Sequence, residues 1–218
     1  MKPSRMPATI GVIIAIVVAF ILELMNGVPL INVETPEHLN ALYNMGAIVG
    51  GMFHAGSPAY GEYWRLFAAM FLHIGLLHLA LNLWALYQLG FLLEVMFGSW
   101  RFLVTYFASG LVASIASALF TQSNGLSAGA SGAIFGILGA LIFAIRRSPV
   151  WRHQQWTKGL VRQLVFWAAI NIVIGRAIPG IDNYAHVGGF LAGLILGFLP
   201  HRVPPPPPGE MVIEASHE

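Results

Sequence analysis

Cysteine is absent from the 218-residue chain, and charged side chains make up only 9% of it. Without cysteine, the chain can form neither a disulfide framework nor a thiolate metal site. An average soluble domain carries about 25% charged residues, whereas 57% of this chain is hydrophobic. So few charges cannot cover a water-soluble fold. The lipid bilayer must therefore be the solvent for most of the chain.

The basic residues are scattered in short clusters between apolar segments. This pattern does not form the continuous basic surface that binds phosphate backbones, so nucleic acid is not an expected partner. It predicts membrane orientation instead, because cytoplasmic loops carry an excess of lysine and arginine. With the N-terminus inside, nine of the eleven basic residues fall on the inner side, and only Arg65 and Arg176 fall outside. Six spans also return the C-terminus to the inner side.

Six apolar segments predict an all-α polytopic membrane protein. They lie near residues 8–25, 71–93, 102–120, 131–145, 160–178 and 184–199. Several are shorter than the ~20 residues that usually cross a bilayer. We expect three parts, namely a cytoplasmic N-terminus at 1–7, a six-span domain at 8–200 and a cytoplasmic tail at 201–218. The domain contains a long outside loop at about 26–70, and the proline-rich tail is expected to be disordered.

Polar side chains are costly inside a span, and their default interpretation is functional. Three predicted spans carry them near their outer ends, the second with His73, His78 and Asn82, the fourth with Ser131 and the sixth with His186. Ser131 precedes Arg146 by 15 residues, and a helix rises about 1.5 Å per residue. The same reckoning from Arg202 places His186 at a similar depth, so both lie ~22–24 Å from the inner surface. Since the hydrocarbon core is about 30 Å thick, these groups can meet in one recessed layer.

This layer has the chemistry of a nucleophilic site. A serine hydroxyl becomes a nucleophile when a base within hydrogen-bond reach accepts its proton, and histidine is the usual base. Ser131 at a helix N-terminus would also present backbone N–H groups to an oxyanion. His78 and Asn82 are four residues apart on one helical face, and both can donate hydrogen bonds. Glycines four apart predict close packing of the fourth and sixth spans, at Gly132, Gly136, Gly189, Gly193 and Gly197.

These motifs, taken in order, resemble those of the rhomboid intramembrane serine proteases across essentially all of residues 8–200. The nucleophile motif of that family is similar to Gly129-x-Ser131-Gly132, and its histidine motif to Ala185-His186-x-Gly188-Gly189. His73, His78 and Asn82 are spaced as in the family's second-span signature. Trp64-Arg65 is similar to the family's tryptophan–arginine pair in the first loop, and Gly90-x-x-x-Glu94-x-x-x-Gly98 fits the turn after the second span.

The resemblance implies a six-transmembrane-helix rhomboid bundle with a serine–histidine dyad, no third carboxylate and a water-filled cavity open to the outer face. Ser131 would be the nucleophile and His186 the general base and then the acid. Asn82, His78 and the Ser131 N–H would stabilise the oxyanion. No cofactor and no metal are implied. Phe135 stands where many members have a tyrosine that stacks on the catalytic histidine, and phenylalanine keeps that stacking surface.

The resemblance also implies substrates, namely single-span membrane proteins cut in or near their transmembrane segments. The expected location is a bacterial inner membrane, with both termini cytoplasmic and the active site opening to the outer face. The sequence leaves the physiological substrate and the oligomeric state open.

Three other classes of protein fit the sequence less well. A zinc metalloprotease would need a third ligand, but His73 and His78 are five residues apart with no acidic residue between them. A transporter would show inverted repeats and broken helices with paired charges, which the sequence lacks. An inactive rhomboid-like binding or trafficking factor shares the fold, but it would usually lack the serine or the histidine.

Four further polar positions are interpreted as structural. We expect His73 to hold the top of the second span, Trp64-Arg65 to brace the first loop and Glu94 to organise the inside turn by hydrogen bonding. Glu23, at the end of the first span, is expected to lie at the membrane interface.

Overall fold

The computed structural model describes residues 6–31, 35–121, 125–149, 151–152, 154–177 and 180–199. The predicted tail at 201–218 and residues 1–5 lie outside this part of the chain. The described residues form eight helices and one two-stranded antiparallel sheet. In chain order these are α1 (Pro7–Met25), α2 (Pro36–Met45), β1 (Ile48–Val49), α3 (Arg65–Ala68), α4 (Leu76–Phe97), α5 (Ser99–Phe120), β2 (Leu126–Ser127), α6 (Ser131–Arg147), α7 (Gln155–Ala177) and α8 (Asn183–Leu196).

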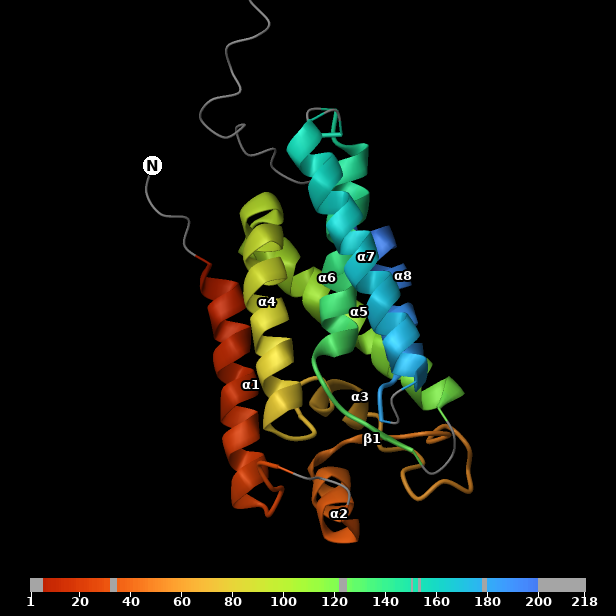
Figure 1. Ribbon diagram of the computed structural model, residues 1–218. Helices are drawn as coiled ribbons and strands as arrows, with labels where there is room; N and C mark the ends of the chain where they lie inside the picture. The colour runs from red at the N-terminus through yellow and green to blue at the C-terminus, as the bar shows by residue number, and fades with distance from the viewer. Residues whose placement is uncertain are drawn as a thin grey trace, which may run out of the picture.

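The six predicted apolar segments correspond to α1 and to α4 through α8, so the all-α class is confirmed. α1 and α4 stand side by side, α5 crosses the bundle obliquely, and α6, α7 and α8 form the other half (Figure 1). One boundary differs from the prediction, because the second segment becomes helical at Leu76 rather than near residue 71. Gly75 precedes it with φ of 84°, a conformation that glycine adopts readily and other residues rarely.

Length separates the six helices into two groups. Among the described residues, α1, α4, α5 and α7 are long and apolar enough to cross a membrane. α6 has 17 residues and α8 has 14. A 14-residue helix rises about 21 Å, which is less than the ~30 Å of a hydrocarbon core. All six predicted segments are helical, but only four of them meet the length of a span on their own.

α6 is the central helix, and nearly every one of its residues is buried. Its closest neighbour is α8, as the glycine pattern predicts. A Cβ on Gly189 would overlap the carbonyl oxygen of Gly132, and one on Gly193 would overlap that of Gly136. The two backbones are therefore in direct contact, and any side chain at these positions would separate the helices.

Glu94 fastens the turn between α4 and α5 to the start of α1. Its carboxylate accepts hydrogen bonds from the backbone N–H groups of Ala8 at 3.0 Å and Thr9 at 2.8 Å, and from the Thr9 hydroxyl at 2.6 Å. The Ser99 hydroxyl donates a fourth at 2.6 Å. A negative charge is favourable here, because the N–H groups at a helix N-terminus have no partners within the helix. These hydrogen bonds confirm the predicted organising role of Glu94.

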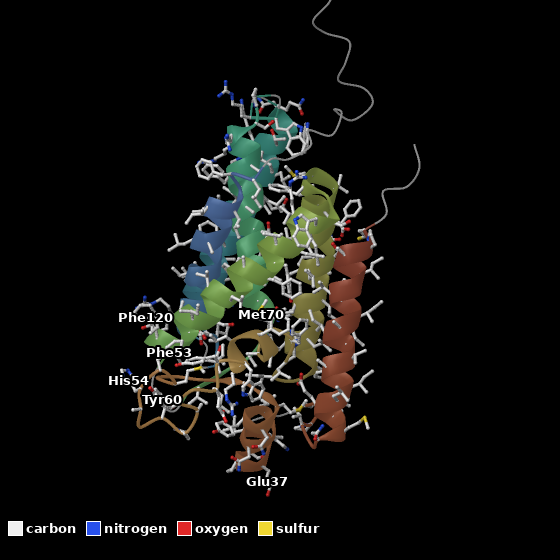
Figure 2. All side chains as sticks on the ribbon, turned by 180° about the vertical axis from the view of Figure 1, so that it is seen from behind. Glu37, Phe53, His54, Tyr60, Met70 and Phe120 are labelled. Carbon is white, nitrogen blue, oxygen red and sulfur yellow. The ribbon has the colours of Figure 1, made fainter. Side chains whose placement is uncertain are left out.

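The connection between α1 and α4 contains structure that hydropathy alone does not predict. It holds the short helices α2 and α3, and its strand β1 pairs with β2 in the register Ile48↔Ser127. Arg65 braces it from within, being 2% exposed. Its guanidinium bonds the carbonyls of Tyr43 and Ala47 and pairs with Glu62 at 2.5 Å. The described part of this connection covers one end of the bundle, where Glu37, His54 and Tyr60 lie (Figure 2).

Candidate active site

Ser131 is the first residue of α6, and the segment before it is held in place by glycine geometry. Gly129 has φ of 139°, and its N–H donates to the carbonyl of Ala69 at 2.9 Å. A Cβ at Gly129 would lie 2.8 Å from Cε1 of His78, so only glycine fits between this loop and the start of α4. Ser131 itself is partly exposed. Its position leaves the first backbone N–H groups of α6 without intrahelical partners.

His186 meets Ser131 across the α6–α8 contact, with Nε2 2.9 Å from the serine Oγ. The first turn of α8 is capped by Asp182, whose carboxylate accepts from the Ala185 N–H at 3.0 Å. The His186 ring is 7% exposed, and its Nδ1 has no hydrogen-bond partner among the described residues. In this geometry the two side chains form a dyad, in which no carboxylate of the described chain contacts the second ring nitrogen.

Phe135 forms the other face of the histidine pocket. Its ring lies parallel to that of His186, with an interplanar angle of 7° and centroids 4.3 Å apart. Ser131 and Phe135 are one turn apart on α6, so a single helix supplies both the hydroxyl and the stacking surface. The contact restricts the imidazole to the plane in which its Nε2 faces Ser131.

His78 is the second histidine beside the serine. A point at the Cβ position of Gly129 would lie 3.0 Å from its Nε2 and 3.8 Å from the Ser131 Oγ. The Ile74 N–H lies 3.3 Å from His78 Nδ1, and a backbone N–H can only donate. Nδ1 must therefore accept, which places the proton of the neutral ring on Nε2. His78 thus presents an N–H toward the loop in front of Ser131.

Asn82 lies one turn further along α4 and is 5% exposed. Its Nδ2 donates to the carbonyl of His78 at 2.9 Å, which leaves the second N–H of the amide for another acceptor. Among the described residues, Asn82 makes no hydrogen bond to Ser131 or His186. The structure thus brings Ser131, His186 and His78 together and places Asn82 behind His78 on the same helix.

Glu23 is the polar residue that the sequence interpretation placed wrongly. The carboxylate does not face lipid or water, since the residue is 0% exposed and Oε1 accepts from the His73 N–H at 3.0 Å. The expectation failed because the connection after α1 folds back over the helix end. The available signal in the sequence was an ionisable residue inside an apolar segment.

His73 lies in the segment between α3 and α4 and is fully buried, as expected for a structural residue. Its ring centroid is 5.2 Å from that of His78, and its Nδ1 lies 3.1 Å from the carbonyl of Phe71. Burial lowers the pKa of His73 to about 3, so the ring is neutral at physiological pH. The described residues hold no cluster of three or more His, Asp or Glu side chains that could bind a metal ion.

Together these groups have the parts of a nucleophilic site. They provide a hydroxyl, a base 2.9 Å away, a ring that orients the base, and N–H donors from a helix terminus and from His78. The fold and this site define the class of a membrane-embedded helical protein with a serine–histidine pair.

Comparison with known proteins gives the same class. The family profile of the Rhomboid domain matches residues 60–203. The chain is 42% identical over 135 residues to Rhomboid protease GluP of Bacillus subtilis (strain 168), an alignment that covers 62% of this chain and 25% of that protein. It is 36% identical over 166 residues to RHOMBOID-like protein 7 of Arabidopsis thaliana, covering 73% and 49%. Rhomboid-type serine protease 2 of Emericella nidulans is 33% identical over 147 residues, covering 67% and 29%.

The chain belongs to the rhomboid family and is an integral membrane protein. It spans about a quarter to a half of the length of these three relatives.

Proposed function

We propose that this protein is an intramembrane serine endopeptidase that cleaves the transmembrane segments of other membrane proteins, mostly single-span ones. The observation that carries the proposal is the 2.9 Å contact between Ser131 Oγ and His186 Nε2 at the start of two short, tightly packed helices. Two of the similar proteins are named as proteases, which supports the proposal. The serine and histidine that an inactive rhomboid-like factor would usually lack are both present.

The proposed reaction follows from the geometry. Ser131 Oγ attacks the carbonyl carbon of the scissile peptide while its proton passes to His186 Nε2. The carbonyl oxygen becomes an oxyanion that accepts hydrogen bonds from the Ser131 N–H and from His78 Nε2–H, with Asn82 as a further donor. His186 then gives its proton to the leaving nitrogen, and the C–N bond breaks to leave an acyl-serine. Water attacks this ester, His186 takes a proton from the water, and that proton returns to Ser131 Oγ as the acid product leaves.

The substrate must present an accessible carbonyl. In a regular helix each carbonyl is held by an internal hydrogen bond, which shields it from attack, so a transmembrane segment has to unwind locally before cleavage. Segments with small or helix-breaking residues unwind at lower cost, because glycine and proline are the weakest helix formers. We therefore propose single-span proteins with such residues near the outer end of their span as the substrate class.

The proposed orientation places both termini in the cytoplasm of a bacterial cell and the active site toward the outer face of the inner membrane. The excess of basic residues at the α6–α7 end supports it. Because the chain has no cysteine, single introduced thiols test it directly. A membrane-impermeant maleimide should label Ala55→Cys in intact cells and Gln155→Cys only after permeabilisation. The reverse labelling would overturn the orientation.

A fluorophosphonate probe tests the chemistry without knowledge of the substrate. We expect the purified protein to be labelled at Ser131 and the His186→Ala variant to be labelled far more slowly, because the hydroxyl then lacks its base. Thermal unfolding of both proteins shows whether the variant is folded. A folded wild-type protein that resists the probe would favour the alternative function, a binding or trafficking factor without catalysis.

A further inference from the structure

The end of the bundle away from Ser131 carries a cavity of about 410 Å³ between the last turn of α6 and the first two turns of α7. Four basic side chains line it, and all of them are exposed, namely Arg146, Arg152, Lys158 and Arg162. Its apolar wall contains Ile145 and Val161, which are 1% and 6% exposed. The cavity therefore combines a cationic rim with an apolar wall.

Among the described residues, no carboxylate lines this cavity. The carboxylates of the described residues are Glu23, Glu37, Glu62, Glu94 and Asp182. Only Glu94 belongs to this end of the bundle, and its two oxygens accept hydrogen bonds from α1 and Ser99. Within the described chain, Arg146, Lys158 and Arg162 take part in no ion pair. Several like charges around one cavity repel one another, and a bound anion would relieve that repulsion.

The arrangement exceeds what membrane orientation requires. Lys158 and Arg162 are four residues apart and so share one face of α7, and Arg146 comes from a different helix. Gln155, the first residue of α7, also lines the cavity, so the helix N-terminus adds its partial positive charge. By contrast, neighbouring Arg147 lies outside the cavity. Its guanidinium donates to the carbonyl of Phe198 at 3.2 Å and stacks on that ring.

We propose that this cavity binds the phosphate group of an anionic phospholipid. Arginine forks match phosphate oxygens, and basic pockets between spans at the headgroup level bind acidic lipid heads. The apolar wall would contact the start of an acyl chain. The cavity lies ~22 Å from Ser131 along α6, so the site is independent of the proposed protease chemistry. A free phosphate ion shares the headgroup chemistry but has no acyl chain to contact the apolar wall.

Native mass spectrometry of the purified full-length protein tests this. Phosphatidylglycerol, zwitterionic phosphatidylcholine and inorganic phosphate are the three probes. We expect one phosphatidylglycerol to bind at low concentration. The double variant Arg146→Gln/Arg162→Gln should bind it roughly 30-fold more weakly, at about fivefold per cation. The matched control, Arg101→Gln/Arg147→Gln, removes the same charge outside the cavity and should bind like the wild type.

Each alternative result overturns the proposal. Equal weakening in the control variant would mean that net charge attracts the lipid without a site. Equal binding of phosphatidylcholine would exclude recognition of an anionic lipid. Binding of inorganic phosphate as tight as that of phosphatidylglycerol would define a phosphate-ion site instead. Arg146, Arg147 and Arg162 are exposed, and Arg101 is half-buried. Thermal unfolding of the same preparations verifies that both double variants are folded.

Discussion

Gly193 of α8 lies directly against the carbonyl oxygen of Gly136 on α6. One turn nearer to the active site, Gly189 meets the carbonyl of Gly132 in the same way. These contacts set the distance between the helices that carry Ser131 and His186. The distance between Ser131 and His186 therefore depends on the absence of side chains at Gly189 and Gly193.

The first prediction concerns Gly193→Ala. The added methyl group has no room, so α8 must move away from α6, and the 2.9 Å contact between Ser131 and His186 must lengthen. A displacement of about 1 Å in reacting groups costs roughly 100-fold in rate. We expect a loss of that order in kcat, measured on the folded fraction. Gly159→Ala in α7 is the matched control, because nothing lies within 4 Å of its Cβ position. Wild-type turnover by folded Gly193→Ala would contradict this account of the packing.

The second prediction concerns Phe135, whose ring stacks on that of His186. Phe135→Leu removes the parallel stack on His186 but keeps an apolar side chain. Aromatic pairs contribute about 0.5–1.5 kcal/mol beyond their buried area, so we expect kcat to fall by up to about tenfold. Phe135→Tyr keeps the stack and should remain close to the wild type. A leucine variant as active as the tyrosine variant would show that the stack does not orient the histidine.

The third prediction separates two roles of Asn82. As an oxyanion donor it acts mainly in the transition state, and loss of one such donor costs up to about 10²–10³ in kcat. Asn82→Ala should lower kcat more than it raises KM, and by less than this range because His78 and the Ser131 N–H remain. Its bond to the His78 carbonyl within α4 suggests the competing role of local structural support. Unchanged kcat with a large fall in melting temperature would assign Asn82 to structure.

The fourth prediction concerns Glu23, which holds the His73 N–H in the segment that leads to His78. Glu23→Gln keeps an oxygen acceptor and should retain most activity, whereas Glu23→Leu leaves a buried N–H unpaired, at about 1–3 kcal/mol. We expect Glu23→Leu to lower kcat with little change in KM.

A double-mutant cycle identifies the route of this effect. If Glu23 acts by placing His78, Glu23→Leu should cause no further loss of kcat in the His78→Ala background. An equal loss in both backgrounds would show that Glu23 supports the fold in general and does not position His78.

The sequence was sufficient to predict the six apolar helices and to select Ser131, His186 and the glycines that bring their helices together. These features carry local signals, because apolar runs predict spans and a polar residue inside a span is costly. The two short strands could not be predicted from such local signals. The β1–β2 pair joins Ile48 to Ser127, and such pairing across distant segments leaves little trace in a two-residue strand.

Burial by a loop is equally hard to predict. Glu23 lies at the end of the first apolar run, where a carboxylate is ordinarily interpreted as an interface residue. Only the folded connection covers it.

The start of α4 was misplaced for a local reason, since Phe71 and Leu72 continue the apolar pattern whereas Gly75 interrupts the helix. The conformation of Gly75, and not the apolar pattern, therefore determines where α4 begins.

The most direct test of the central claim is cleavage of a single-span membrane protein by the purified protein in liposomes, in buffer containing EDTA. Wild-type protein is compared with Ser131→Ala and His186→Ala, all three shown to be folded by thermal unfolding. We predict cleavage within or near the transmembrane segment by the wild type and none by either variant, because the nucleophile and its base act as one unit. Cleavage by Ser131→Ala at the wild-type rate would contradict the account.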